Sequence, residues 1–355
     1  MSALTEEANA GTMGVREEHR LDEPRLSQWM HEHVPDFEGP LYIEQFKGGQ
    51  SNPTYKLNTP RLSYVLRRKP PGQILPGAHD VEREARVLKA LGGIGFPVAY
   101  VHGVCADPAV LGSPFYVMQM VEGRIFWDAR FPQVSREERP AYFDAMNSTL
   151  AALHRIDYAA LGLSDFGKPG NYFARQIARW SKQYLQDGDA GRDENMDRLL
   201  EWLPKNIPDD GQTSIAHGDF RCDNMIFHPH EARILAVLDW ELSTLGHPLA
   251  DFAYHAIMYR MPPHIVAGLQ GTDLHAMNIP TEAEYVAAYC ARTGRTSIPA
   301  YDYYIAFNCF RLAAIFHGIK GRVLRGTAAS AHAKEHAASF PILARLARES
   351  MEACR

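Results

Sequence analysis

The residues best suited to chemistry lie in one short stretch, His217-Gly218-Asp219-Phe220-Arg221-Cys222-Asp223-Asn224, and in a later acid, Asp239. An aspartate on a loop can orient and deprotonate a hydroxyl group. The amide oxygen of Asn224 and the carboxylate of Asp239 are hard oxygen ligands suited to Mg²⁺, which keeps several waters and binds nucleotide phosphates. A base and two such ligands are what phosphoryl transfer requires, because that reaction depends mainly on positioning and charge neutralisation.

The elements that must position these residues fall into two parts of different character. Turn signals and alternating apolar residues predict strands at 41–47, 55–58, 62–67, 98–104 and 115–121, with helices at 24–33 and 79–91. From Ser135, a predicted helix cap with Glu138 as its capping-box acid, the chain is mostly helical. The helical part holds a short β insert at 213–216, 225–227 and 234–238. We therefore predict an α+β fold with a small antiparallel β-rich lobe over 21–121, a larger helical lobe over 122–355 and a flexible tail over 1–20.

Composition excludes several other classes of protein. The 37 Lys and Arg against 42 Asp and Glu give a net charge of −5, which argues against nucleic-acid binding. No apolar run approaches the ~18 residues of a membrane-spanning helix, and we do not expect the polar N-terminus to act as a signal peptide. The five cysteines are odd in number and include no CxxC pair. We therefore expect a cytoplasmic protein without a membrane partner.

The pattern HxDxxxxN, present as His217, Asp219 and Asn224, together with Asp239 resembles the aminoglycoside phosphotransferase family, which shares the protein-kinase-like fold. Two further segments, 64–72 and 246–251, resemble the branch related to the kinase-like domains of acyl-CoA dehydrogenase fusion proteins. The resemblance covers roughly residues 40–325. It implies ATP and Mg²⁺ as cofactors and a small-molecule hydroxyl compound as the second substrate.

The same resemblance implies roles for individual residues. Asp219 would be the catalytic base, Asn224 and Asp239 the Mg²⁺ ligands, and Asp251 a buried acid that braces the catalytic-loop backbone, while His217 would be structural. The nucleotide would bind to the N-lobe sheet. Two segments would contact it, a hinge facing adenine at Met118, Gln119, Met120 and Val121 and a turn near the phosphates at Gly48, Gly49, Gln50, Ser51 and Asn52.

One departure from the family concerns the cation that holds the phosphates. Strand parity places Val65 and Arg67 on one face. The resemblance implies that this face looks into the cleft, so Arg67 would occupy the position of the usual lysine. Glu84 shares the inward stripe of its predicted helix with Val81 and Leu88, and it is the expected partner of that cation. Arg68 or Lys69 could take the role instead.

The acceptor end of the site is less specific. The predicted helix 303–325 places Arg311, Arg322 and Arg325 in a narrow angular band. Residues 301–355 contain eight Lys or Arg and four Asp or Glu, a local charge of 8 − 4 = +4. This excess favours an anionic hydroxy compound, such as a hydroxyacyl-CoA or a hydroxy acid, although it also suits a solvated basic face.

Three other interpretations remain at this point. The chain could be a catalytically inactive nucleotide-binding or interaction module, since the usual lysine is missing. It could be a kinase acting on aminoglycosides or amino alcohols. A protein kinase fits less well, because no APE motif or evident activation segment follows Asp239. The sequence leaves the oligomeric state and the choice between ATP and GTP open.

Overall fold

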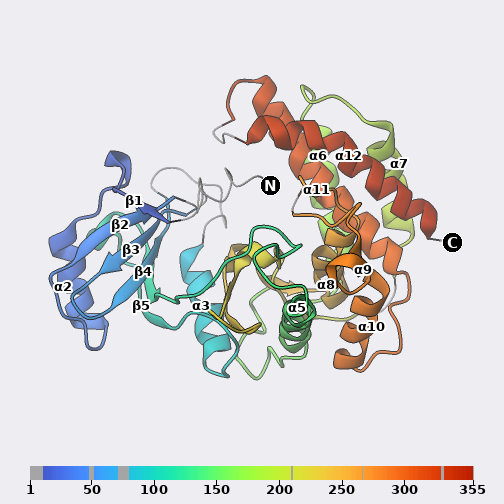
Figure 1. Ribbon diagram of the computed structural model, residues 1–355. Helices are drawn as coiled ribbons and strands as arrows, with labels where there is room; N and C mark the ends of the chain where they lie inside the picture. Colours follow the sequence, from blue (N-terminus) through green and yellow to red (C-terminus); the bar gives the residue numbers. More distant parts are fainter. Residues whose placement is uncertain are drawn as a thin grey trace. The chain divides into compact units, whose positions relative to one another are not determined.

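The structure is a computed structural model that describes residues 11–47, 52–70, 80–208, 211–265, 267–328 and 332–354 (Figure 1). The chain divides into two compact units. The first runs to Trp127 and also takes in Ala159–Leu163 and Cys222–Ser243. The second consists of Asp128–Tyr158, Ser164–Arg221 and the chain from Thr244 onwards. The α+β architecture predicted from the sequence is confirmed, and the segment containing Asn224 and Asp239 belongs to the β-rich unit.

A six-stranded antiparallel sheet forms the centre of the first unit, in the order β1-β2-β3-β4-β6-β5 (Figure 1). Its strands are β1 (Thr12–Met13), β2 (Tyr42–Phe46), β3 (Thr54–Asn58), β4 (Ser63–Arg68), β5 (Val101–Cys105) and β6 (Phe115–Gln119). The five predicted strands are all present. Strand β1 was not expected, because its residues fall within the predicted tail; it pairs with β2, placing Thr12 opposite Phe46.

Helices and a hairpin complete this unit. They are α2 (Glu23–His33), α3 (Val81–Gly92), α4 (Pro108–Leu111), the 3₁₀ turns η1 (Glu17–His19), η3 (Cys222–Asn224) and η4 (Trp240–Leu242), and the strands β8 (Met225–Phe227) and β9 (Ile234–Val237). Asp80 caps α3 by accepting a hydrogen bond from the Arg83 N–H at 3.0 Å. The buried face of α3 includes Val81, Glu84 and Leu88, the stripe that helical periodicity predicts.

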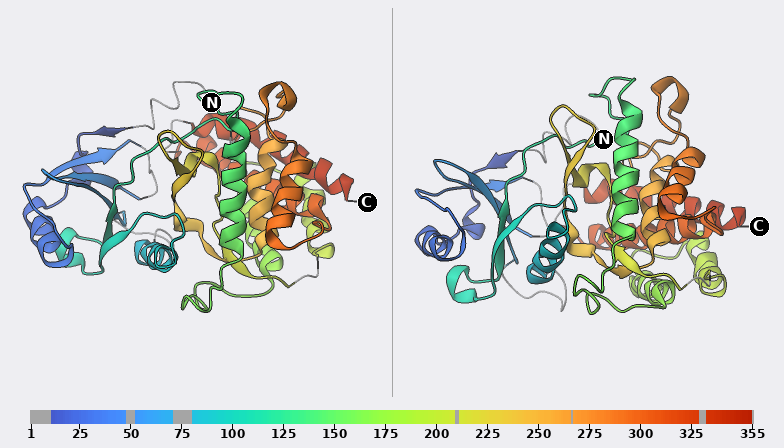
Figure 2. Two further views of the ribbon diagram at one scale, coloured as in Figure 1. Left: turned by 60° about the horizontal axis from the view of Figure 1, so that its bottom comes forward. Right: turned by 90° about the horizontal axis from the view of Figure 1, so that it is seen from below.

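The second unit is mostly helical. It contains α5 (Arg139–His154), α6 (Tyr172–Gln186), α7 (Glu194–Trp202), α8 (Pro248–Ala256), α9 (Leu274–Met277), α10 (Glu282–Thr293), α11 (Tyr301–Leu324), α12 (Ala333–Ala353), η2 (Leu203–Lys205) and η5 (Ile257–Tyr259). Two short strands, β7 (Ser214–Ala216) and β10 (Thr244–Gly246), pair antiparallel. Helix α11 is buried over most of its length, and α12 packs along it (Figure 2). No helix within the described ranges is long and apolar enough to cross a membrane.

The capping box predicted at Ser135 is wrong. Helix α5 begins at Arg139, and the Ser135 hydroxyl donates to the Glu138 carboxylate at 2.6 Å without capping a helix. A helix starting at Arg136 would place Pro140 beyond its first turn, where the missing N–H would leave the Arg136 carbonyl without its partner. Starting at Arg139 instead puts Pro140 in the first turn, where proline is well tolerated.

Candidate functional site

A cavity of about 470 Å³ lies in the first unit, within the size range of small-molecule sites. Eight residues that the sequence singles out line it: Arg67, Glu84, Met118, Gln119, Met120, Val121, Asn224 and Asp239. Much of the remaining wall is apolar and includes Val65, Ile226 and Leu238. Apolar walls with a few charged groups at one place suit a ligand that has a flat ring and an anionic end.

Sheet register explains why the strand residues meet in this cavity. Strand β4 pairs with β6 so that Val65 lies opposite Met118 and Arg67 opposite Tyr116. Residues two apart on a strand, and residues opposite each other on neighbouring strands, share one face of the sheet. All four side chains therefore reach the same cavity.

Arg67 makes a network of ion pairs at the polar end of the cavity. Its Nε lies 2.9 Å from Glu84 Oε2, and its Nη2 lies 2.9 Å from Asp239 Oδ1 and 3.5 Å from Glu241 Oε2. The Arg67 and Glu84 side chains are only 12% and 3% exposed. Arg68 does not compete for this position, because its Nε donates to the Ser113 hydroxyl at 2.8 Å.

Burial and charge act in opposite directions on this pair. Burial disfavours charge on Arg67, but the carboxylate of Glu84, with further help from Tyr116 and Asp239, raises the pKa of the guanidinium above its usual value. Burial raises the pKa of Glu84 to about 7, against the opposing effect of Arg67. The cation therefore stays charged at neutral pH, while burial works against the charge of Glu84 and Arg67 supports it.

The donors in the cavity fit a metal ion that arrives with other ligands. Asn224 and Asp239 line the same cavity, and the Leu238 N–H donates to the Asn224 carbonyl at 2.8 Å, which ties the two segments together. Asp239 adopts a left-handed backbone (φ 61°), and its side chain is 36% exposed. Among the described residues no group of three or more His, Cys, Asp or Glu could hold a metal ion by itself. One amide and one carboxylate oxygen suit Mg²⁺ that completes its coordination with phosphates and water.

The predicted phosphate turn is only partly described. Gly48, Gly49, Gln50 and Ser51 lie outside the described residues. Asn52 is buried, and its amide donates to the Glu241 carboxylate at 3.4 Å. Asn52 is thereby connected to the Arg67 network through Glu241.

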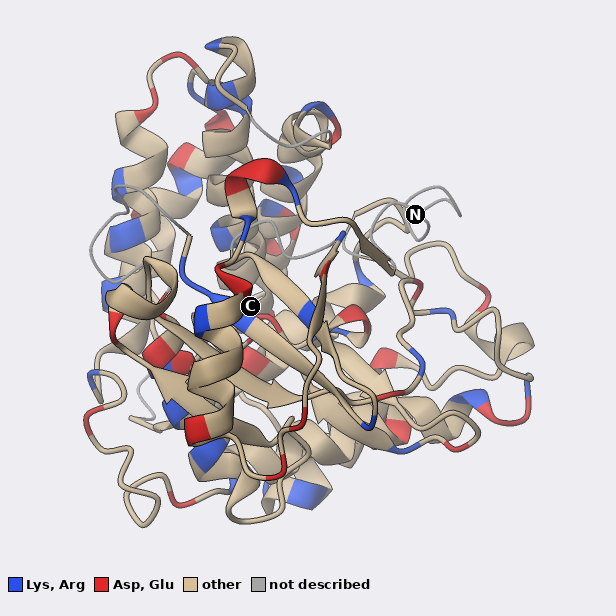
Figure 3. Cartoon of the chain, turned by 90° about the vertical axis from the view of Figure 1, so that its left-hand side faces the viewer, with Lys and Arg blue, Asp and Glu red and all other residues tan. Residues whose placement is uncertain are grey.

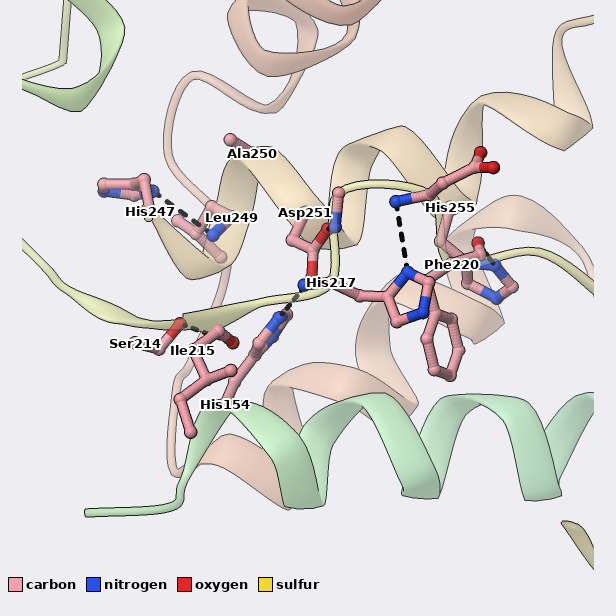
Figure 4. Close-up of polar contacts among 12 residues, drawn as sticks. His154, Ser214, Ile215, His217, Phe220, His247, Leu249, Ala250, Asp251 and His255 are labelled. Carbon is pink, nitrogen blue, oxygen red and sulfur yellow. Dashed lines mark hydrogen bonds and ion pairs between the residues drawn. The ribbon is translucent and has the colours of Figure 1, made fainter. Parts of the chain in front are cut away.

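The loop residues His217 to Arg221, which include the predicted base Asp219, lie in the second unit, and the first turn of α8 holds the start of this loop (Figure 4). The Asp251 carboxylate accepts the His217 N–H at 2.7 Å on Oδ2 and the Gly218 N–H at 2.8 Å on Oδ1. His154 Nε2 lies 3.2 Å from the same Oδ2. Burial alone would raise the pKa of Asp251, but His154 and the Gly218 N–H bring it below its usual value. Asp251 is thus a buried carboxylate whose partners compensate for its loss of water.

Asp219 has a side-chain partner that sequence reasoning missed. The Tyr254 hydroxyl donates to Asp219 Oδ1 at 2.5 Å, and Arg221 Nε lies 3.3 Å from the same oxygen. Burial opposes charge on Asp219, but Arg221 and Tyr254 lower its pKa. Tyr254 is three residues beyond Asp251, one helical turn, so a search for side chains on the face of Asp251 could have found it. His217 Nδ1 accepts the Asp219 N–H at 3.2 Å, a structural contact.

The three arginines expected at the acceptor end do not form one anion site. Arg311 is buried and donates from Nη2 to the Gly218 carbonyl at 3.0 Å. Arg325 is paired with Asp187 at 2.7 Å and Asp189 at 2.9 Å, and Arg322 is exposed. A Cβ at Gly321 would lie 2.0 Å from Asp187, so the glycine lets this carboxylate approach α11. The angular band is real, but its members have different partners.

A second hollow of about 450 Å³ has walls of both signs. Arg179, Lys182 and Arg325 line it together with Asp187 and Asp189. Acidic and basic residues are likewise interspersed along the chain in Figure 3. The local excess of positive charge in 301–355 is therefore partly neutralised by acids from elsewhere in the sequence.

Known proteins provide an independent comparison. Residues 43–307 match the model of the phosphotransferase enzyme family. A curated relative, acyl-CoA dehydrogenase family member 10 from Mus musculus, is 43% identical over 311 residues, which cover 87% of this chain and 29% of that protein. The chain spans 29% to 43% of the length of the first curated relatives that it matches.

Solved structures agree with this match. A proposed aminoglycoside phosphotransferase from Ralstonia eutropha is 47% identical with a TM-score of 0.87, and the match covers 95% of this chain and 100% of that one. A thermostable mutant of aminoglycoside phosphotransferase APH(4)-Ia, in a ternary complex with AMP-PNP and hygromycin B, is 15% identical with a TM-score of 0.59, covering 92% and 98%. At that level of identity the second likeness concerns the fold alone.

Proposed function

The chain belongs to the phosphotransferase enzyme family, and we propose that it is an ATP- and Mg²⁺-dependent kinase that phosphorylates a hydroxyl group of a small molecule. The observation that carries this proposal is the cavity of the first unit. It combines apolar walls with a buried Arg67–Glu84 ion pair, an amide oxygen and a carboxylate. Phosphoryl transfer needs little more from a protein than such positioned charges.

Arg67 is the group that would hold the nucleotide phosphates. Its guanidinium has five N–H donors in a fixed fork, so it can bind Glu84 with one edge and phosphate oxygens with another. Lysine would bring only a point charge to the same place. Retention of a paired, buried cation at this position also argues against the inactive-module interpretation, which the missing lysine first suggested.

Asp219 would act on the acceptor. As the acceptor oxygen forms its bond to the γ-phosphorus and the bond to the bridging β-γ oxygen breaks, the hydroxyl proton passes to the Asp219 carboxylate. Its lowered pKa keeps that carboxylate ionised at neutral pH. Asn224 and Asp239 would hold Mg²⁺, which offsets the charge of the phosphates.

The acceptor is proposed to be an anionic hydroxy compound, either a hydroxyacyl-CoA or a hydroxy acid. The names of the curated relatives, which are acyl-CoA dehydrogenase family members, support this class. Arg179 and Lys182, two cations in the wall of the second hollow, and the exposed Arg322 also support an anionic acceptor. An aminoglycoside is the competing class, since hygromycin B is bound in a structure of the same fold.

The test is a transfer assay with radiolabelled γ-phosphate and four groups of acceptors: hydroxyacyl-CoAs, hydroxy acids, amino alcohols and aminoglycosides. We expect label to move to a member of the first two groups only with Mg²⁺ present, and to be lost in Asp219→Asn. Transfer only to aminoglycosides or amino alcohols would overturn the acceptor class. Mg-ATP binding measured by calorimetry, without transfer to any of the four groups, would instead favour the inactive module.

A further inference from the structure

We propose that Tyr254 is a positioning residue for the catalytic base: its hydroxyl fixes the orientation of the Asp219 carboxylate toward the acceptor hydroxyl. This inference rests on the proposed role of Asp219. The contact is short, 2.5 Å from the Tyr254 hydroxyl to Asp219 Oδ1, as expected for a hydrogen bond to a charged acceptor.

Helix α8 holds the loop at successive positions. Three of its side chains contact four consecutive loop residues: Asp251 contacts His217 and Gly218, Tyr254 contacts Asp219, and His255 contacts Phe220. Within this set, the contacts to His217, Gly218 and Phe220 reach backbone groups, whereas the contact from Tyr254 reaches the side chain of Asp219. Tyr254 therefore extends to the reactive group the support that α8 gives to the loop backbone.

The direction of the hydrogen bond is fixed by chemistry. Burial, and then the charge of Asp219, raise the pKa of the Tyr254 phenol, so Tyr254 keeps its proton at neutral pH. Asp219 has a lowered pKa and accepts as a carboxylate. The phenol is a donor that binds the ionised form of the base more strongly than its protonated form.

Tyr254 is itself held in place. The Arg311 guanidinium lies 5.2 Å from the centre of its ring, within the range of a cation–π contact, and also donates to the Gly218 carbonyl. The charged and titratable groups that act on Asp219 include Arg221 and His217 from the loop, Tyr254 from α8 and Arg311 from α11. Tyr254 donates to the carboxylate from a ring that also contacts Arg311.

Loss of the hydroxyl should therefore affect proton transfer and leave nucleotide binding alone. Without this donor, Arg221 still lies beside the carboxylate, but the carboxylate should spend less time in the productive orientation, and such misplacement can cost up to about 100-fold in rate. Tyr254→Phe keeps the ring and its contact with Arg311. We expect kcat to fall about 10- to 100-fold, with KM for ATP within about twofold of its original value and with the pKa of Asp219 raised.

The experiment compares Tyr254→Phe with Tyr184→Phe, a matched control. Tyr184 also donates a hydrogen bond from a buried ring to a carboxylate, Asp197 Oδ1 at 3.0 Å, but lies outside the loop contacts described above. The kinetic assays use the acceptor that the unsubstituted protein phosphorylates in the four-group assay. In parallel, ¹³C-carboxyl NMR of aspartate-labelled protein follows the Asp219 signal, assigned by its loss in Asp219→Asn, over a pH titration.

A lower kcat with unchanged KM for ATP and an upward shift of the Asp219 titration, both absent in Tyr184→Phe, would support the proposal. Unchanged kcat, or equal losses in both variants, would overturn it. If the original protein phosphorylates no acceptor, the proposed function fails, and the NMR titration alone still decides the contact: an unshifted Asp219 signal in Tyr254→Phe would show that Tyr254 does not hold the base.

Discussion

The two units anchor their functional residues by different physical means. In the first unit, ion pairs connect Arg67 to Glu84 and Asp239, and these three side chains come from a strand, a helix and a loop. In the second, the loop around Asp219 is held mainly by hydrogen bonds to one helix: its N–H groups donate to Asp251, and its Phe220 carbonyl accepts from His255. Side-chain ion pairs can exchange partners when a charged ligand enters, but backbone hydrogen bonds fix the path of the chain. The comparison indicates that the ion-pair cluster proposed to bind phosphates can exchange partners, whereas the loop that carries the proposed base is fixed along its backbone.

The largest effect should separate Asp219 from Asp239. Asp219→Ala should lower kcat about 1,000-fold, since general base catalysis contributes 10²- to 10⁴-fold, while Mg-ATP affinity changes little. Asp239→Ala should instead weaken Mg-ATP binding, because it removes a proposed metal ligand and a partner of Arg67. Calorimetric titration with Mg-ATP and steady-state kinetics measure the two effects, with the exposed Asp189→Ala as control. Equal loss of nucleotide binding in both variants would contradict the division of roles.

Breaking the ion pair tests how adaptable the cluster is. Arg67→Ala leaves Glu84 buried without its cation, which should cost about 3–5 kcal/mol in the free energy of unfolding and raise KM for ATP strongly. Arg67→Lys keeps the charge without the fork and should retain partial activity. Adding Glu84→Gln to Arg67→Ala should recover most of the stability but none of the ATP affinity, as measured by urea unfolding and calorimetry. Recovered affinity would show that Arg67 does not bind the phosphates.

The smallest effect concerns pH and the rigid loop. His255 is buried, and burial lowers its pKa to about 4. Its Nδ1 lies 3.0 Å from the Phe220 carbonyl, which can only accept, so Nδ1 carries the proton and Nε2 accepts from the Tyr285 hydroxyl at 2.7 Å.

A buried histidine with a lowered pKa stays neutral in the folded protein, whereas the same histidine takes up a proton in the unfolded chain at a higher pH. Falling pH therefore favours the unfolded chain and lowers the free energy of unfolding. The stability that neutral His255 contributes is fully present above its usual pKa of 6.5 and is lost as the pH falls toward 4. The free energy of unfolding should change by roughly 3 kcal/mol over this range. His255→Asn keeps a donor for Phe220 but cannot titrate. Urea unfolding between pH 7 and 4 should therefore show a shallower loss of stability in the variant. An identical pH dependence would mean that His255 is not the titrating group.

Sequence reasoning succeeded where short-range periodicity decides the geometry. Strand parity is a local property, so it predicted correctly that Val65 and Arg67 share a face. Helical periodicity placed Glu84 on the buried stripe of α3 for the same reason. The comparisons confirm the family resemblance that the spacing of His217, Asp219 and Asn224 suggested.

It failed where a residue's partner comes from a distant segment. The basic band on α11 is visible in the sequence, but the acids that neutralise Arg325 follow α6, more than 130 residues earlier. A second failure was local: the start of α5 depended on the competition between a capping box and Pro140, and the capping motif alone does not show that competition. The roles of the individual site residues remain predictions that the experiments above test.

By itself, the sequence determined which residue types are available and how they repeat: a base, an amide and an acid at fixed spacing, and a cation in place of the usual lysine. Tertiary structure decided which side chains bind one another. It brought Asp239 and Glu241 to Arg67 beside Glu84, placed Tyr254 against Asp219, and committed Arg311 to the loop backbone. The physical reason is that charge and hydrogen-bond energies fall off within a few ångströms, so chain folding, rather than sequence position, selects the partners.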